Sequence, residues 1–342
     1  MSNTELPHKC SIPQKMRAIV LPQPDEQIHL NDVEVDVPEC ANNELLVKVE
    51  YVGLNPVDAN FAKAGFCEWQ YPHILGLDAV GVVVKANKGV FPNVGERVMW
   101  HANIGGQGVL SEYTTVPNFA VSVVPDGLSP SQAATLPCAG MAALISLDKI
   151  AIAEGDTVLI EGGSGAVGQF AIQYAKQRGA DVFATASKRN HKMVKQLGAD
   201  AVFDYNDKKL CDKIRRELGP QGFDAVIDTI GGDATSRNIE LMRFCGRIAC
   251  LQPLPHFDQN LMYRRAPNIS VVSLSGAWLA NSLCAQQWLS FMGNLLLEGA
   301  LSGDIKTPSI SAVDFSAESI SAALKNQIAG GFTGKQVVQI SS

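Results

Sequence analysis

The segment EGGSGAVGQ at residues 161–169 follows directly on the apolar run TVLI at 157–160. Gly163, Gly165 and Gly168 in this segment have the spacing GxGxxG between an expected strand and an expected helix. In that position, glycines allow a tight turn, the close approach of a pyrophosphate to the backbone, and close packing of helix on strand. The free N–H groups at the start of the helix then face the phosphates.

We therefore predict a dinucleotide site at this turn, with a purely structural glycine turn as the alternative. The residues expected to contact the cofactor are Gly163, Ser164, Gly165, Ala166, Val167 and Gly168.

Outward from the turn, strands and helices alternate from about residue 133, a pattern that predicts a parallel sheet. The helix expected at 166–179 has an apolar stripe and ends at Gly179. Further helices are expected at 189–198 and 208–219. About six strands are expected, at 156–162, 181–186, 201–205, 223–232, 246–252 and 268–276.

The sequence before residue 133 has a different pattern. Residues 16 to about 132 are rich in strand formers and turns and have little helical periodicity, which predicts a β-rich barrel or sandwich. The tail from about residue 280 opens with a long expected helix at 281–299 and closes with the strand-like GKQVVQIS at 334–341. The chain length of 342 residues also favours two domains.

The end of the second expected strand indicates which dinucleotide binds. An NAD site would place an acidic residue there, to bond the ribose hydroxyls. Here the sequence is DVFATASKRN at 181–190, so Asp181 lies at the opposite end of the strand. Ser187, Lys188 and Arg189 take the place of the acid, and a hydroxyl with two cations suits a 2′-phosphate. We therefore predict NADPH, the alternative being that both cations belong to a solvated helix start.

Composition excludes several classes of function. With 46% hydrophobic and 18% charged residues the chain is an ordinary globular protein. The net charge of −6 and the lack of Lys/Arg blocks argue against nucleic acid or an anionic membrane as partner. No apolar run has the length of a bilayer span and the polar start lacks a signal-peptide core, so we expect a cytoplasmic protein. The eight cysteines form no CxxC pair and are expected mostly as small buried side chains.

Several segments together resemble one family. The chain is similar to the zinc-free quinone oxidoreductase-like (zeta-crystallin-like) group of the medium-chain dehydrogenase/reductase superfamily. The resemblance rests on GLNPVD (53–58), ILGLDAVGVV (74–83), GERVM (95–99), AATLPCAGMAAL (133–144), GGSGAVGQ (162–169), LGADAVFDY (197–205) and GKQVV (334–338).

The resemblance implies an α/β protein with a split GroES-like catalytic domain at 1–132 and 280–342, and a Rossmann domain with a doubly wound parallel sheet at 133–279. It also implies a homodimer joined through the last Rossmann strands. By resemblance Tyr205 is a second 2′-phosphate ligand, with a buried core tyrosine as the alternative. Asn55 would bond near the ribose and nicotinamide, and Asp58 would support that loop; for both, an Asx-capped turn is the alternative.

The resemblance also bears on metal binding. Zinc-dependent members of the superfamily place cysteine where this chain has Asn55, and His-Glu where it has Leu77 and Asp78. Only Cys138 and the weak candidate Asp78 remain, whereas a catalytic zinc needs three protein ligands. We therefore expect no metal ion, and we expect Cys138 to be a packing residue in the core or on the cofactor face.

Without a metal, conjugate reduction is the favoured reaction, because the developing enolate is spread over several atoms and hydrogen bonds can stabilise it. We predict an NADPH-dependent reductase of quinones or α,β-unsaturated carbonyls. His101 is the candidate proton donor, with a structural histidine as the alternative. The alternative functions are an alcohol or aldehyde dehydrogenase of the same superfamily and a non-catalytic NADPH-binding protein. An aromatic slot for a planar substrate, or else core packing, is expected from Phe61, Phe66, Trp69 and Tyr71.

Overall fold

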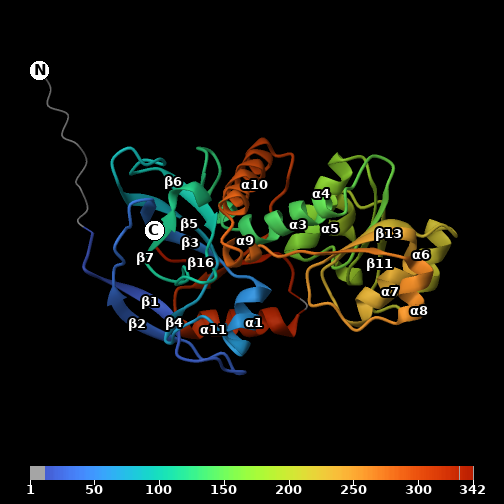
Figure 1. The fold of residues 1–342 in the computed structure, drawn as a ribbon, viewed down its shortest axis with the longest axis horizontal. Helices are drawn as coiled ribbons and strands as arrows, with labels where there is room; N and C mark the ends of the chain where they lie inside the picture. Colours follow the sequence, from blue (N-terminus) through green and yellow to red (C-terminus); the bar gives the residue numbers. More distant parts are fainter. Residues whose placement is uncertain (1–11, 331, 342) are drawn as a thin grey trace, which may run out of the picture.

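The structure is a computed structural model that describes residues 12–330 and 332–341. Its strands form a six-stranded parallel sheet, at the right of Figure 1, and two further sheets at the left. The fold is therefore a Rossmann-like parallel sheet combined with a β-rich part, as the sequence predicts. The six parallel strands lie between residues 157 and 271. The domain bounds after residues 132 and 279 stay a prediction.

The six-stranded sheet has the order β11-β10-β9-β12-β13-β14, and each neighbouring pair is parallel. This order, in which the chain starts in the middle and reverses direction once, is that of a doubly wound dinucleotide-binding fold. The strands are β9 (Thr157–Ile160), β10 (Asp181–Thr185), β11 (Ala201–Phe203), β12 (Phe223–Asp228), β13 (Met242–Cys250) and β14 (Asn268–Val271).

The helices between these strands cover the sheet. The first of them begins right after the glycine turn and buries Phe170, Ala171 and Ile172 completely, so that more than one face of this helix is covered. The helices are α4 (Ala166–Gln177), α5 (His191–Gln196), α6 (Leu210–Leu218), α7 (Asp233–Leu241) and α8 (Gln259–Arg265), with a 3₁₀ turn η2 (Lys188–Asn190) before α5.

The β-rich part contains a seven-stranded and a three-stranded sheet. The larger one has the path β15-β16-β3-β5-β6-β8, with β7 also paired to β3, and its strands are β3 (Glu44–Gly53), β5 (Asp78–Ala86), β6 (Arg97–His101), β7 (Tyr113–Pro117), β8 (Ser122–Val123), β15 (Ile310–Asp314) and β16 (Lys335–Gln339). The smaller one has the order β2-β1-β4, with β1 (Lys15–Leu21), β2 (Asn31–Asp36) and β4 (His73–Ile74).

The C-terminal strand β16 therefore pairs with a strand from the N-terminal part of the chain. Strand β16 runs antiparallel to β3, with Val337 opposite Gly53, so that the C-terminal strands complete a sheet built from the N-terminal third (Figure 1). This pairing brings Lys335, at the start of β16, close to the loop after β3. It is the tertiary contact on which the candidate site depends.

The remaining helices cover or connect the two parts. They are α1 (Pro56–Ala64), η1 (Asn118–Ala120), α2 (Pro130–Ala133), α3 (Pro137–Lys149), α9 (Gly276–Leu279), α10 (Leu283–Ser302) and α11 (Ala317–Ala329). Helices α3 and α10 belong to one hydrophobic core that extends from β9 and α4 to Val80 and Met99 of the larger β-sheet. No helix in the described part of the chain is both long and apolar enough to span a bilayer.

The expectation of a β-rich segment before residue 132 is confirmed, and the nine-residue helix α1 lies within it without having been predicted. Pro56 is the first residue of this helix, where its missing N–H costs nothing. The carboxylate of Asp58 accepts the backbone N–H of Asn55 at 2.8 Å, which caps the helix start. The short helix also packs against α11, far away in the sequence.

Candidate active site

A cleft of about 650 Å³ lies where the glycine turn faces the β-rich part. Asn55, Phe61, His101, Cys138 and Lys335 line its β-rich side. The glycine turn and the end of β14 contribute the other side, through Gly162, Gly165, Ala166, Val167, Gly168 and residues 272–275. Among the described lining residues there is no aspartate or glutamate, and the lone lysine or arginine is Lys335.

The glycine turn has the geometry that a dinucleotide requires. Gly162 has a φ of +67°, and a Cβ on Gly168 would lie 2.4 Å from the Gly162 carbonyl oxygen, so no other residue fits between turn and helix. Gly163 is buried below the surface of the turn, where its N–H donates to the Thr185 carbonyl at 2.8 Å. The Ser164 carbonyl accepts from the side chain of Gln169 at 2.8 Å. Of the six predicted residues, four line the cleft: Gly165, Ala166, Val167 and Gly168.

A buried polar chain holds the turn from below, and sequence reasoning missed it. The Thr185 hydroxyl accepts from the Gly162 N–H at 3.1 Å and donates to the carboxylate of Glu161. Glu161 is 2% exposed and also pairs with the guanidinium of Arg237. Because Glu161 and Thr185 are buried and bonded to each other, they fix the position of the backbone that would meet a pyrophosphate.

The residues predicted for the 2′-phosphate follow two neighbouring strands. Ser187, Lys188 and Arg189 come after β10, and Tyr205 comes after β11, which pairs with β10 in parallel. The carboxyl ends of parallel strands lie at the same edge of a sheet, so these side chains belong to one edge. Lys188 and Arg189 are exposed, and Tyr205 is 49% exposed, so the alternative of a buried core tyrosine is wrong.

On the β-rich side of the cleft, a fully buried carboxylate organises the polar side chains. Asp78 accepts hydrogen bonds from His101 Nδ1 at 2.8 Å and from Asn55 Nδ2 at 2.9 Å. It also accepts from the Cys138 N–H and from Lys335 Nζ, both at 3.1 Å. Burial by itself would raise the pKa of Asp78, but the Lys335 ammonium and the His101 hydrogen bond hold that pKa below its usual value. Asp78 is therefore an anion that orients its four donors.

Asn55 and Asp58 lie together beside this carboxylate. Asn55 has its side-chain amide engaged with Asp78, and its Oδ1 accepts from Lys335 Nζ. Burial, and then the nearby charge of Asp78, raise the pKa of Asp58 to about 7. Asp58 thus supports the Asn55 backbone from inside the protein, and Asn55 lines the cleft.

One ring nitrogen of His101 makes no hydrogen bond within the described part of the chain. Its Nδ1 is bonded to Asp78, whereas its Nε2 is buried without a hydrogen-bond partner among the described residues. The ring is 2% exposed and lines the cleft. A neutral ring with Nδ1–H presents Nε2 as an acceptor, and a protonated ring presents it as a donor. A buried polar atom without a partner is unfavourable unless a ligand completes it.

The four aromatic residues form two layers. Phe61 and Phe66 line the cleft. Trp69 lies behind them, with ring centroids 5.4 Å from Phe61 and 5.9 Å from Phe66, and donates from Nε1 to the Ile104 carbonyl at 2.6 Å. The Tyr71 hydroxyl accepts from the Phe66 N–H at 3.3 Å. Phe61 and Phe66 can therefore contact a planar substrate, and Trp69 and Tyr71 hold them in place.

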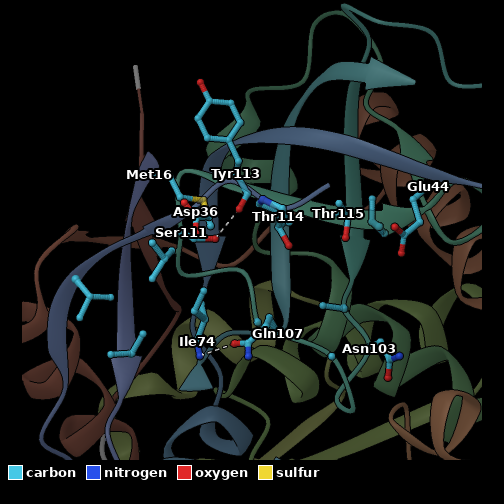
Figure 2. Close-up of a pocket in the computed structure, with 18 of the residues that line it drawn as sticks. Met16, Asp36, Glu44, Ile74, Asn103, Gln107, Ser111, Tyr113, Thr114 and Thr115 are labelled. Carbon is cyan, nitrogen blue, oxygen red and sulfur yellow. Dashed lines mark hydrogen bonds between the residues drawn. The ribbon is translucent and has the colours of Figure 1, made fainter. Parts of the chain in front are cut away.

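A second cavity, of about 670 Å³, lies within the β-rich part between β1, β2 and β7 (Figure 2). Thr114 and Thr115 line one side, and Gln107, which accepts the Ile74 N–H at 2.9 Å, lies at its lower end in Figure 2. None of the predicted site residues lines this cavity. The candidate active site is therefore the cleft at the glycine turn.

Comparison with known proteins agrees with this geometry. A family model described as the alcohol dehydrogenase GroES-like domain matches residues 41–126, and one described as zinc-binding dehydrogenase matches residues 166–292. The chloroplast envelope quinone oxidoreductase homolog of Arabidopsis thaliana is 31% identical over 91% of this chain and 94% of its own length.

The chain belongs to the medium-chain dehydrogenase/reductase superfamily. It is an oxidoreductase of the quinone oxidoreductase-like group. A trans-enoyl reductase of Aspergillus terreus is 37% identical over 58% of this chain and 71% of its own length. Among solved structures, a mycobacterial protein in complex with NADPH has a TM-score of 0.83 and 25% identity, covering 95% of this chain and 99% of that one.

The superfamily includes zinc enzymes, and one matching family model is described as zinc-binding dehydrogenase. Ligand atoms of Asp78, His101 and Cys138 lie within 4.8 Å of one another. However, the Asp78 carboxylate already holds the Lys335 ammonium, and burial together with Asp78 raises the pKa of the Cys138 thiol, so the thiol is neutral. Asp78, His101 and Cys138 nevertheless supply the number of ligands that a catalytic zinc ion needs, and zinc would compete with the Lys335 ammonium for Asp78 and with the proton for Cys138. The expectation of no metal ion stays a prediction.

In this member of the superfamily, Lys335 is the site residue that sequence reasoning did not single out. Lys335 belongs to the segment GKQVV at 334–338, which in the sequence analysis contributes only to the family resemblance. Lys335 stands two positions before the apolar pair Val337 and Val338, and a lysine so close to a buried strand could have indicated a buried charge. The sequence alone does not show that this strand pairs with β3.

Proposed function

We propose that this chain is an NADPH-dependent reductase that transfers hydride to quinones or α,β-unsaturated carbonyl compounds without a metal ion. The observation that carries the proposal is the cleft itself. It joins a glycine turn at a helix start to a histidine nitrogen that is buried without a partner among the described residues, and two aromatic rings line the same cleft. The names of the Arabidopsis and Aspergillus relatives support a reductase of this kind.

NADPH is the cofactor that the chain's own residues favour. The backbone of the glycine turn and the first N–H groups of α4 would hold the pyrophosphate. Ser187, Lys188, Arg189 and Tyr205 would surround the 2′-phosphate at the edge formed by β10 and β11. The NADPH complex of the mycobacterial neighbour supports this assignment.

NADPH held in this way would supply a hydride to the far carbon of a C=C–C=O unit or to a quinone. Negative charge then develops on the substrate oxygen, and a proton completes the reduction. A protonated His101 would donate from Nε2 to that oxygen, while Asp78 fixes the ring through Nδ1. Asn55 and Asp58 act as positioning residues for the cleft wall. The rings of Phe61 and Phe66 would lie against a planar substrate and exclude water.

The test is NADPH oxidation by the purified chain with a 1,4-quinone, an enone and a simple aldehyde. We expect turnover of the first two and little of the third. His101→Phe should lower kcat about 100-fold with little change in NADPH affinity, because one proton donor is lost. His256→Phe, at an exposed position, is the matched control.

Two other functions are distinguished by the same assay. An alcohol or aldehyde dehydrogenase is favoured by the description of the matching family model, and turnover of the aldehyde alone would establish it. Tight NADPH binding with no reduction of any acceptor in a broad panel would instead indicate a non-catalytic binding protein.

We also propose a homodimer formed through the outer edge of the parallel sheet. Strand β14 is the last strand of that sheet, and Val271 at its end is 53% exposed. An open strand edge with an exposed apolar residue is suited to pairing with a second copy. The molar mass of the chain in solution tests this proposal.

A further inference from the structure

Lys335 is a buried lysine that faces a cleft. Its side chain is 3% exposed, and an ammonium group is buried at this cost only when it is paired. Lys335 Nζ contacts Asp78 Oδ2 at 3.1 Å and also Asn55 Oδ1. An ammonium has three N–H donors, and these two are the hydrogen bonds it makes within the described part of the chain. One donor therefore remains for a ligand in the cleft.

The electrostatic potential in the cleft depends on the Lys335 ammonium. The described lining of the cleft holds no carboxylate, and Asp78, which pairs with Lys335 at 3.1 Å, is fully buried behind that lining. The charge of Asp78 is shared among its other donors, His101, Asn55 and the Cys138 N–H. The ammonium thus keeps part of its positive potential, which acts strongly on a nearby anion because Lys335 is itself buried.

We propose that Lys335 is a catalytic residue whose ammonium binds the substrate oxygen and stabilises the negative charge that develops there. This inference rests on the proposed reductase function and deepens it. Metal-dependent relatives would use a cation to polarise such an oxygen. Here the chain's own cation lies among Asp78, His101 and Cys138, the three side chains closest to a metal-binding set. Lys335 and His101 are bonded to the two oxygens of the same Asp78 carboxylate and both line the cleft, and the proposal has both act on one substrate oxygen.

The proposal makes the substrate class more specific. The enolate formed from a simple enone shares its charge between one oxygen and one carbon and is strongly basic, whereas the anion formed from a 1,4-quinone spreads its charge over an aromatic ring and is much less basic. The enone should therefore depend on the ammonium more strongly than the quinone does. A lysine that only neutralises Asp78 would affect both acceptors equally.

The experiment compares kcat/KM for both acceptors in wild type, Lys335→Met and Lys335→Arg. Lys335→Met leaves Asp78 buried without its cation, so the double variant Lys335→Met/Asp78→Asn keeps the cluster neutral and tests the charge if the single variant fails to fold. Lys325→Met, at an exposed position of α11, is the matched control. NADPH affinity, measured by fluorescence titration, reports whether each variant still has an intact cofactor site.

We expect Lys335→Met and the double variant to lose about 100-fold or more in kcat/KM for the enone, as for the removal of one oxyanion donor. The loss for the quinone should be at least about 10-fold smaller, NADPH affinity should stay close to wild type, and Lys335→Arg should keep part of the activity. Equal losses for enone and quinone, or a double variant that reduces the enone as well as wild type does, would overturn the role of Lys335. A wild-type chain that reduces neither acceptor would instead overturn the proposed function, and the role of Lys335 with it.

Discussion

The ionisation of Asp58 should make the folded chain less stable as the pH rises. Burial, and then the charge of Asp78, raise the pKa of this carboxyl to about 7, compared with 3.8 for an ordinary aspartate. Between these two values the unfolded chain has already released the proton that the folded chain still holds. The contribution of Asp58 to stability is therefore largest below about pH 4, falls as the pH rises towards 7, and is constant above pH 7.

The size of this effect on stability follows from the shift in the pKa of Asp58. A change of about 3 pK units corresponds to about 4 kcal/mol in the free energy of unfolding. Because the carboxyl is 2% exposed, solvent screening does not reduce this figure appreciably. Folded proteins have about 5–15 kcal/mol of stability in total, so the loss should be easy to measure.

Asp58→Asn isolates the contribution, because the amide oxygen can still accept the Asn55 N–H but cannot ionise. Urea unfolding of variant and wild type is followed by tryptophan fluorescence from pH 4 to pH 8. We expect the variant to gain about 4 kcal/mol relative to wild type across this range. Asp212→Asn, at an exposed position of α6, serves as the control. A difference between Asp58→Asn and wild type that does not change with pH would refute the reasoning.

Three further predictions concern the cofactor site and the metal. Lys188→Ala should weaken NADPH binding by about 1–3 kcal/mol and leave NADH binding unchanged in a titration, whereas equal weakening of both would count against a 2′-phosphate contact. Gly168→Ala would bring a Cβ to 2.4 Å from the Gly162 carbonyl oxygen. It should cost about 1–3 kcal/mol in stability and more than 10-fold in NADPH affinity, whereas Gly106→Ala, whose nearest atom is 3.6 Å away, should change neither. Dialysis against a strong zinc chelator should leave enone turnover unchanged, and a loss of activity restored by Zn²⁺ would show that the donor set binds metal after all.

Much of the parallel-sheet part can be predicted from local sequence. The glycine turn, helix α4 and the two cations after β10 are neighbours along the chain, and turn chemistry and periodicity are encoded over such short distances. The six strands are confirmed for the same reason. Helix α1 was missed because its nine residues carry too weak a periodic pattern, and its start is held by the contact between Asp58 and Asn55.

The candidate site on the β-rich side is a product of tertiary structure. Asn55 and Lys335 are 280 residues apart in the sequence, and Asp78 and Lys335 are 257 apart, yet all three meet because β16 pairs with β3. Nothing local encodes such a pairing, since it depends on which strand edges remain open once both parts have folded. The amino-acid sequence by itself therefore determined the cofactor turn and its phosphate preference. Long-range packing decided that a lysine from the end of the chain would be the cation of the cleft.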